Sequence, residues 1–564
     1  MNYMDCYQFW CNADLPEEVK VELASLAGNE DELKGRFGSE LQFGTAGMRG
    51  LMGYGSNRLN RYTVRRAAQG MAAWLSGTDL PKIAAIGYDS RHNSQLFAEV
   101  CAVAFAERGI KTWLFDRLAP TPMLSYAVRQ LGCGCGIVIS ASHNAGAYNG
   151  VKCYGPDGCQ MTDEPAAIVT ATIAKIPYFE PETKDFAAYL NDGIISYIGQ
   201  ELWESYYETV LAEAVDAAML KEAGLNIVYT PLCGTGNEPV RTVLGRLGVN
   251  ITVVAAQERP DGDFKTCEYP NPETDAALHE SYKVARNAPC DVILGTDPDC
   301  DRVAIAVPDG DGYRKLSGNE LGCLLMDYVL KARRLKADIP QNAIVVRSIV
   351  SSPLADRIAE HYGVKMVQVL TGFKYIGGEI LKLEQIGAEK CYLFGFEESC
   401  GYLKGTYARD KDAVVASMLV CELAAFLKKQ NKTILDALDE IYAKYGYYLA
   451  HVQSVELTGA DAMEKAAAMM AQLRENVPAT IGGAKVCGVR DYRSSVARNL
   501  LTGEEERIDL PKSNVLEFLL GEHGSVIARP SGTEPKVKFY YTAVGENGEQ
   551  AQALLDRMIR QMSV

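Results

Sequence analysis

The stretch KIAAIGYDSRHNSQLFAEVCAVAFAERGIKTWLFD, residues 82–116, holds one complete round of strand, helix and strand. Residues 82–90 are a short apolar run with a polar end, which predicts a buried strand. Residues 94–109 carry apolar side chains at helical spacing and finish at Gly109, a residue typical of helix ends. Residues 111–116 predict a second strand. Strands joined through a helix pair in parallel by a right-handed crossover, so this stretch indicates an α/β domain.

The same alternation returns twice further along the chain, at residues 225–309 and 343–403. After about residue 445 the pattern changes to long strand-like and helical segments, as in a smaller α+β domain. We therefore expect an α/β fold of three consecutive α/β domains with mixed or parallel sheets, and a smaller C-terminal α+β domain, around a central cleft. The predicted domains span residues 1–195, 196–310, 311–445 and 446–564.

Composition narrows the class of protein. The chain has 564 residues, 48% of them hydrophobic and 23% charged, with a formal net charge of −15. Such a composition is globular, and its acidity disfavours nucleic acid and anionic membranes as partners. The 16 cysteines are scattered without paired C-x-x-C sets, and there is no signal-like N-terminus or long apolar run. We expect a cytoplasmic protein with reduced thiols.

Ligands of open α/β domains bind beyond the carboxyl ends of the strands, so the loops that follow strands are the candidate site. The first, SASHNAGAYNGVK (residues 140–152), places Ser142 as a candidate nucleophile, His143 beside it and Lys152 as a proton carrier or phosphate ligand. A polar loop with satisfied hydroxyl groups is an equally good reading of this fragment alone. Ser142 does not match the G-x-S-x-G elbow of hydrolases.

The second loop is GTDPDCDR, residues 295–302. Alternate residues of an extended segment project to the same side, so Asp297, Asp299 and Asp301 converge. Three carboxylates would repel one another without a cation, and oxygen ligands suit Mg²⁺. Arg302 follows at once and could steer a phosphate. The alternative is that this loop is an acidic surface turn without a bound metal. That interpretation fits poorly because apolar strands flank the loop.

Two further loops offer groups for a phosphosugar. FGFEESCGYL (residues 394–403) puts Glu397 and Ser399 after an apolar strand, where they could hold sugar hydroxyls, although for this loop alone a charged turn is the better explanation. ARPSGTEPKVKFYY (residues 528–541) offers a guanidinium, two hydroxyls and open backbone N–H groups, which suit a phosphate. Its candidate residues are Arg529, Ser531, Gly532 and Thr533. Arg49 in FGTAGMRG (residues 43–50) and Lys374 in TGFK (residues 371–374) add basic groups.

These motifs, in this order along most of the chain, resemble the α-D-phosphohexomutase superfamily of phosphoglucomutases and phosphomannomutases. The FGTAG-x-RG start is most similar to the subgroup of bacterial phosphoglucomutases and phosphopentomutase-like enzymes. The resemblance implies that Ser142 carries the transferable phosphoryl group and that Asp297, Asp299, Asp301 and the phosphorylated Ser142 hold Mg²⁺. It also implies catalytic roles for Lys152, His143, Arg49 and Arg302, and substrate binding by Lys374, Glu397, Ser399, Arg529, Ser531, Gly532 and Thr533.

Under this resemblance we expect a phosphoglucomutase, an isomerase that interconverts α-D-glucose 1-phosphate and glucose 6-phosphate through a phosphoserine and glucose 1,6-bisphosphate, which is also the expected activator. Mannose or pentose phosphates, a glucose-1,6-bisphosphate synthase, and an inactive phosphosugar-binding protein are the alternatives. Three positions depart from the pattern: Ala145 replaces the usual proline, Cys233 stands where many relatives have histidine, and no histidine closely follows Ser399. The general base therefore stays open, and Lys152 could serve only if nearby cations and burial lower its pKa. The oligomeric state is not predicted.

Overall fold

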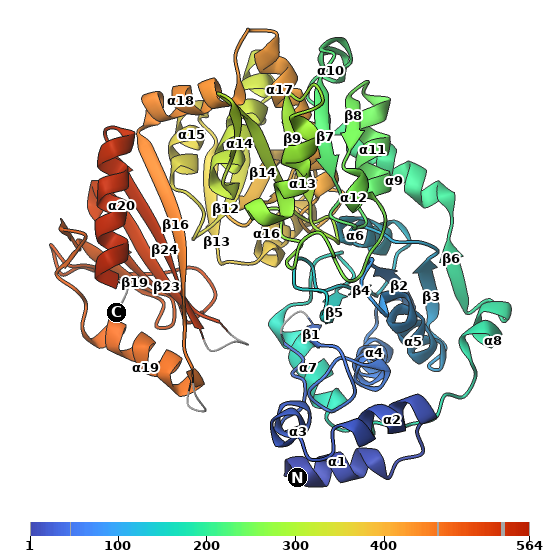
Figure 1. Ribbon diagram of the computed structural model, residues 1–564. Helices are drawn as coiled ribbons and strands as arrows, with labels where there is room; N and C mark the ends of the chain where they lie inside the picture. Colours follow the sequence, from blue (N-terminus) through green and yellow to red (C-terminus); the bar gives the residue numbers. More distant parts are fainter. Residues whose placement is uncertain (1, 45–46, 459–461, 532–535, 563–564) are drawn as a thin grey trace. The chain divides into compact units, whose positions relative to one another are not determined.

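The computed structural model describes residues 2–44, 47–458, 462–531 and 536–562 (Figure 1). The chain forms two compact units. The first unit comprises residues 1–317, 376–392 and 399–430, and the second comprises residues 318–375, 393–398 and 431–564. Within the described residues, no helix is both long enough and apolar enough to cross a membrane.

A six-stranded sheet forms the start of the first unit, with the strand order β1-β5-β4-β2-β3-β6. Its parallel part confirms the crossover predicted from residues 82–116, because β2 pairs in parallel with both β3 and β4. The last two strands at the other edge, β5 and β1, run antiparallel to their neighbours. The strands are β1 (Gly47–Leu51), β2 (Ile83–Tyr88), β3 (Lys111–Phe115), β4 (Cys135–Ile139), β5 (Tyr148–Tyr154) and β6 (Ile195–Ile198).

Helices pack on this sheet through small and apolar residues. Helix α5 (Ser94–Ala106) is buried along most of its length because five of its thirteen residues are alanine or cysteine and let it approach the strands closely. Helices α4 (Arg61–Ser76) and α7 (Asp163–Ile173) share the core that α5 forms on this sheet, whereas α6 (Thr121–Gln130) packs against β2 and β4 outside that core. At the N-terminus, α1 (Tyr3–Cys11), α2 (Glu17–Ser25) and α3 (Glu30–Phe37) surround the buried Trp10.

The second sheet of the first unit has the order β11-β10-β9-β7-β8. Strands β7 (Asn226–Thr230), β8 (Asn250–Val253) and β9 (Val292–Thr296) are parallel, whereas β10 (Val303–Asp309) and β11 (Gly312–Lys315) form an antiparallel extension. The aspartate loop is therefore the hairpin that joins β9 to β10. Helix α17 (Ala413–Lys428) belongs to the same unit, and Asp412 caps its first turn by accepting from the N–H groups of Val414 and Val415.

The second unit contains two layered parts. Strands β13 (Lys365–Val369), β12 (Ile344–Ser348) and β14 (Tyr392–Glu397) lie in this order, with α14 (Gly318–Leu335) and α15 (Leu354–Tyr362). The C-terminal part is an antiparallel sheet of order β16-β24-β23-β22-β19-β20-β21, covered by α19 (Ala462–Glu475) and α20 (Gly548–Met562), as expected of an α+β domain. Its strands are β16 (Tyr447–Glu456), β19 (Gly488–Asp491), β20 (Val496–Asn499), β21 (Glu505–Arg507), β22 (Leu516–Leu519), β23 (Gly524–Pro530) and β24 (Lys536–Gly545).

Candidate active site

Ser142 lies three residues beyond the end of β4, at the carboxyl edge of the first sheet. Its side chain is buried, and its Oγ donates a 2.7 Å hydrogen bond to Asp297 Oδ2. The Nδ1 atom of His143 lies 3.2 Å from the same Oγ. The backbone of Ser142 is left-handed, with φ 51°, a conformation that costs free energy in any residue with a side chain. Surrounding contacts must therefore hold this serine in place.

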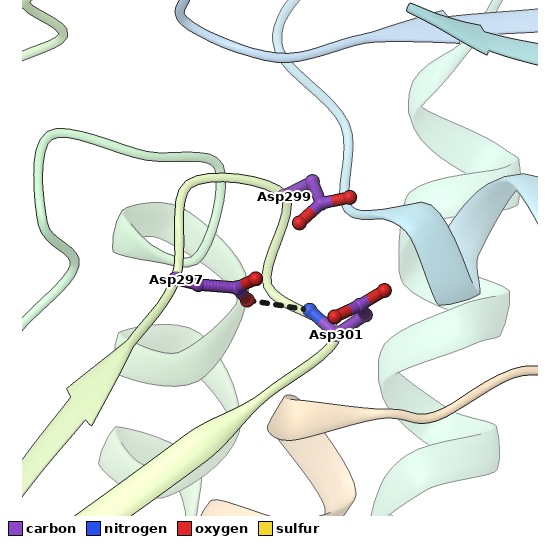
Figure 2. A group of neighbouring side chains, drawn as sticks. All are labelled: Asp297, Asp299 and Asp301. Atoms are coloured by element: carbon purple, nitrogen blue, oxygen red, sulfur yellow. Dashed lines mark hydrogen bonds between the residues drawn. The ribbon is translucent and has the colours of Figure 1, made fainter. Parts of the chain in front are cut away.

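The three aspartates of the β9–β10 hairpin converge (Figure 2). Asp297, Asp299 and Asp301 are all buried, and one carboxylate oxygen from each lies within 4.8 Å of the other two. The hairpin folds around Asp297, whose Oδ1 accepts from the backbone N–H of Asp301 at 3.1 Å and of Arg302 at 3.0 Å. Burial and the two neighbouring carboxylates raise the pKa of Asp297 well above its usual value. A cation here would remove that repulsion.

The donor set fits a hard divalent cation. The Oδ1 atoms of Asp299 and Asp301 are buried and have no hydrogen-bond partner among the described residues. Leaving such oxygens unsatisfied is costly, so they point to a ligand that the protein itself does not supply. An all-oxygen set suits Mg²⁺ better than Zn²⁺, which prefers nitrogen and sulfur. Thr121 Oγ1 donates to Asp299 Oδ2 at 2.9 Å and orients that carboxylate.

Two lysines face these carboxylates. Lys152 on β5 places its Nζ 2.5 Å from Asp299 Oδ2 and 3.3 Å from Asp301 Oδ2. Burial opposes its charge, but the two carboxylates outweigh burial and raise the pKa of Lys152 above its usual value. In this arrangement the pKa of Lys152 is raised, whereas a general base at this position needs a lowered pKa. Lys411 Nζ lies 3.1 Å from Asp301 Oδ2 and 3.1 Å from Asp410 Oδ1.

The remaining predicted catalytic residues border the same place. Arg49 on β1 donates from Nη1 to Asn144 Oδ1 at 2.9 Å, which connects β1 to the serine loop. Arg302 donates from Nη1 to Glu273 Oε1 at 3.2 Å and is partly buried. The partial burial of His143, together with the guanidinium groups of Arg302 and Arg49, lowers the pKa of its imidazole well below the usual value. His143 is therefore neutral at physiological pH.

Most of the predicted substrate-binding residues belong to the second unit. Glu397, at the end of β14, accepts from the backbone N–H of Gly372 at 2.6 Å and so fixes the TGFK turn. Lys374 lies in the first turn of α16 (Phe373–Gln385), with its Nζ 5.0 Å from the ring centroid of Tyr375. Ser399, partly buried, is assigned to the first unit.

The predicted phosphate-binding loop follows β23. Burial raises the pKa of Tyr540 to about 12, with Glu398 adding to this shift and Arg529 opposing it. Arg529 therefore lies near a tyrosine and a glutamate of its own unit. The backbone N–H of Ser531 donates to Lys536 O at 2.8 Å. Gly532 and Thr533 lie outside the described residues.

The structure thus gathers Ser142, His143, Lys152 and the three aspartates at one point of the first unit. It also brings in two residues that the sequence analysis did not single out as site residues, Thr121 and Lys411. The run RDKD (residues 409–412) before α17 was a visible signal for Lys411, because four charged residues entering a buried helix need partners. Thr121 had no comparable signal, since its role depends on a partner 178 positions away.

Known proteins resemble this chain over most of its length. Four models of the phosphoglucomutase/phosphomannomutase family match the chain: α/β/α domain I at residues 40–179, domain II at 204–310, domain III at 317–445 and the C-terminal domain at 460–561. A phosphoglucomutase of Staphylococcus haemolyticus (strain JCSC1435) is 36% identical over 517 residues, which are 91% of this chain and 92% of that protein. A phosphoglucomutase of Staphylococcus aureus (strain USA300) is 34% identical over 561 residues, 97% and 99% of the two chains.

Solved structures share the fold at lower sequence identity. A phosphoglucomutase/phosphomannomutase family protein from Burkholderia thailandensis superposes with a TM-score of 0.66 at 16% identity, covering 93% of this chain and 97% of that one. The open form of the phosphoprotein parafusin, a phosphoglucomutase from Paramecium, gives a TM-score of 0.66 at 17% identity, covering 92% and 93%.

Proposed function

Because the chain belongs to the phosphoglucomutase/phosphomannomutase family, we propose that it is a phosphoglucomutase that interconverts α-D-glucose 1-phosphate and glucose 6-phosphate. The family and the curated relatives make the chain an isomerase of carbohydrate metabolism. The choice of glucose follows the phosphoglucomutases that match nearly the whole chain. The cytoplasm is the proposed location, and small sugar phosphates are the proposed partners.

One observation carries the proposal: a buried serine hydroxyl hydrogen-bonds, at 2.7 Å, to one of three clustered carboxylates. A hydroxyl in that position is well placed to carry a phosphoryl group, and phosphoryl transfer mainly requires positioning and charge neutralisation. Mg²⁺ held by Asp297, Asp299, Asp301 and the seryl phosphate would neutralise charge on the phosphoryl group. Arg302, the residue after the last aspartate, would contribute a second positive charge.

In the proposed cycle, phosphorylated Ser142 is the resting enzyme. The free hydroxyl of the sugar phosphate attacks the phosphorus, a new P–O bond forms, and the bond from phosphorus to Ser142 Oγ breaks. The product is glucose 1,6-bisphosphate and unmodified Ser142. The bisphosphate then turns over in the site and returns its other phosphoryl group to Ser142 Oγ, which releases the isomer. Free glucose 1,6-bisphosphate would act as activator by phosphorylating the empty serine.

Each transfer also moves one proton, from the attacking hydroxyl to a base and eventually to the departing seryl oxygen. Two side chains are positioned to hold this proton. Neutral His143 has its Nδ1 3.2 Å from Ser142 Oγ, and Lys152 is close by but protonated beside Asp299 and Asp301. Lys152 therefore suits proton donation and charge neutralisation, whereas His143 can accept a proton directly.

The other predicted residues would recognise the parts of the substrate that do not react. We propose that Glu397 and Ser399 bind sugar hydroxyls and that Lys374 contacts the substrate. Arg529, Ser531, Gly532 and Thr533 would hold the non-transferring phosphate through charged and backbone donors. These groups must accept either end of the bisphosphate, which explains why they lie on chain segments separate from the aspartate loop.

The test is a comparison of kcat/KM for the 1-phosphates of glucose, mannose, glucosamine and ribose, with Mg²⁺ and catalytic glucose 1,6-bisphosphate. We expect glucose 1-phosphate to be the best substrate and the isolated protein to be partly one phosphate heavier by intact mass. A protein that takes up the phosphate at Ser142 but isomerises none of the four sugars would contradict the proposed function.

A further inference from the structure

A buried guanidinium lies inside the serine loop. Arg91, three residues after the end of β2, donates from Nη1 to the carbonyl oxygens of Ala145 and Tyr148, both at 2.9 Å. Its Nη2 donates to the carbonyl oxygen of Ser142 at 2.6 Å and to that of Asn144. The side chain of Arg91 has no exposed surface. Four backbone carbonyls of one short loop therefore point at a single planar cation.

The guanidinium is held from its other sides as well. Asp89 Oδ2 lies 3.4 Å from Arg91 Nε, and Asp89 Oδ1 accepts from the backbone N–H of Arg91 at 3.0 Å. The ring of Phe264 covers the guanidinium, with 4.9 Å between Arg91 Cζ and the ring centroid. The side chain therefore has little freedom to move, and the loop that surrounds it is correspondingly restrained.

Restraint of this loop matters because Ser142 is strained. Its φ of 51° is held by contacts on both of its backbone polar groups: its N–H donates to Ser140 Oγ at 2.8 Å, and its carbonyl accepts from Arg91. The loop also packs closely against the segment that contains Gly262, because a Cβ atom added at Gly146 would lie 2.7 Å from Gly262 O. At position 145 the chain has alanine instead of a ring-stiffened proline, so hydrogen bonds must supply the rigidity.

We propose that Arg91 is a positioning residue for phosphoryl transfer. Resting on the proposed function of Ser142, it holds the serine loop so that Ser142 Oγ meets the aspartates in one orientation. Arg91 touches neither the carboxylates nor, through its side chain, the reacting oxygen. Lysine could not replace it, because an ammonium group is a point charge and cannot donate to four carbonyls arranged around a plane.

The test compares Arg91→Lys and Arg91→Ala with Arg66→Lys and Arg66→Ala. Arg66 is an apt control because it is also buried, donates to the carbonyls of Ile173 and Ile176, and stacks on Tyr178, away from the serine loop. For both Arg91 variants we expect kcat to fall about 100-fold with KM changed less than about threefold, as for a small misplacement of a reacting group. Phosphorylation of Ser142 by glucose 1,6-bisphosphate, followed by intact mass, should slow by a similar factor.

Chemical rescue separates positioning from general stability. Millimolar guanidinium chloride, but not sodium chloride, should restore part of the kcat of Arg91→Ala, and neither salt should change the Arg66 variants. The proposal is overturned if folded Arg91→Lys keeps the kcat of the unmodified protein, loses no more than Arg66→Lys, or changes KM alone. Unfolding of both Arg91 variants by circular dichroism would also overturn it, since Arg91 would then serve the fold. An unmodified protein without mutase activity would instead contradict the proposed function.

Discussion

The Oγ of Ser142 donates a 2.7 Å hydrogen bond to Asp297 Oδ2, although 155 positions separate the two residues in the chain. The serine follows a strand of the first sheet and the aspartate follows a strand of the second. Two sheets thus contribute one residue each to a single contact, as expected when ligands bind beyond the carboxyl ends of strands. Substitutions at and around this contact test its role in phosphoryl transfer.

Ser142→Ala removes the oxygen that would carry the phosphoryl group. We expect kcat to fall by about 10⁴-fold or more, because a covalent route is lost and water cannot replace it efficiently. Intact mass should show no phosphate after incubation with glucose 1,6-bisphosphate. Ser417→Ala is the matched control, since Ser417 Oγ is buried without a hydrogen-bond partner among the described residues. Full activity in Ser142→Ala would show that the mechanism is wrong.

Asp299→Asn removes one charge from the carboxylate cluster. Within the described part of the chain its Oδ1 has no hydrogen-bond partner, so we expect Mg²⁺ affinity measured by calorimetry to weaken by about tenfold or more. Excess EDTA should abolish activity, and saturating Mg²⁺ should raise the thermal midpoint of the unmodified protein because the ion binds only the folded state. Asp327→Asn, which removes a partly buried carboxylate that accepts a hydrogen bond from Tyr362, should leave Mg²⁺ affinity unchanged. If both variants bound Mg²⁺ with equal affinity, the assignment of the three aspartates as metal ligands would be wrong.

Lys152→Met removes the cation closest to Asp299 and Asp301. We expect kcat to fall about 100-fold to 1,000-fold, because charge neutralisation and proton transfer both suffer. The same variant should bind Mg²⁺ more tightly, since the carboxylates lose a competing positive charge. The control is Lys404→Met, which removes a buried lysine from its ion pair with Glu213. It should change neither kcat nor the Mg²⁺ affinity. A variant that keeps its kcat would leave His143 as the group that moves the proton.

Arg529→Lys tests the proposed phosphate clamp. A guanidinium can bind a phosphate through two parallel hydrogen bonds and an ammonium cannot, so we expect KM for glucose 1-phosphate to rise about tenfold. The value of kcat should change much less, because the contact is made to the phosphate that is not transferred. Arg490→Lys, which keeps a charge near Glu517 in the same domain, serves as the control. A fall in kcat with KM intact would place Arg529 at the reacting phosphate instead.

Glu384 gives a prediction for stability against pH. The hydrogen bond from Arg129, opposed by burial and supported by Arg409, lowers the pKa of Glu384 to about 2. A depressed carboxylate pKa stabilises the folded state above its unfolded value, near 4.5, and that stability is lost as pH falls toward 2. Because the side chain is one-third exposed, we expect Glu384→Gln to cost about 1 kcal/mol at pH 7.

The measurement is the urea midpoint of the first unfolding transition between pH 7 and pH 3. The gap between Glu384→Gln and the unmodified protein should narrow steadily below about pH 4.5. Glu360→Gln, which disrupts an exposed pair with Arg357, should show no such trend. A gap that stays constant over the whole pH range would mean that the charge of Glu384 does not stabilise the fold.

Local patterns were sufficient to predict the fold class. Alternating apolar strands and amphipathic helices imply parallel pairing wherever they occur, and β2, α5 and β3 follow residues 82–116 closely. The antiparallel pairing of β1, β10 and β11 was not foreseen, because strand direction depends on where the chain returns and not on its composition. The limits of the four domains stay a prediction, since the two compact units divide residues 317–445 between them.

The sequence by itself determined the chemistry that this protein can offer: a serine after a strand, three alternating carboxylates in one hairpin, and basic loops suited to phosphate. Those signals are local, because a residue type and its spacing are enough to specify which atoms face the same side. Only the tertiary structure shows which of these groups are in contact. It places Lys152 beside Asp299, where the pKa of the lysine is raised, and it places the Arg91 side chain inside the serine loop. These contacts join residues that are far apart in the chain. Arg91 binds backbone carbonyl groups, which every residue possesses, so the sequence pattern does not identify its partners.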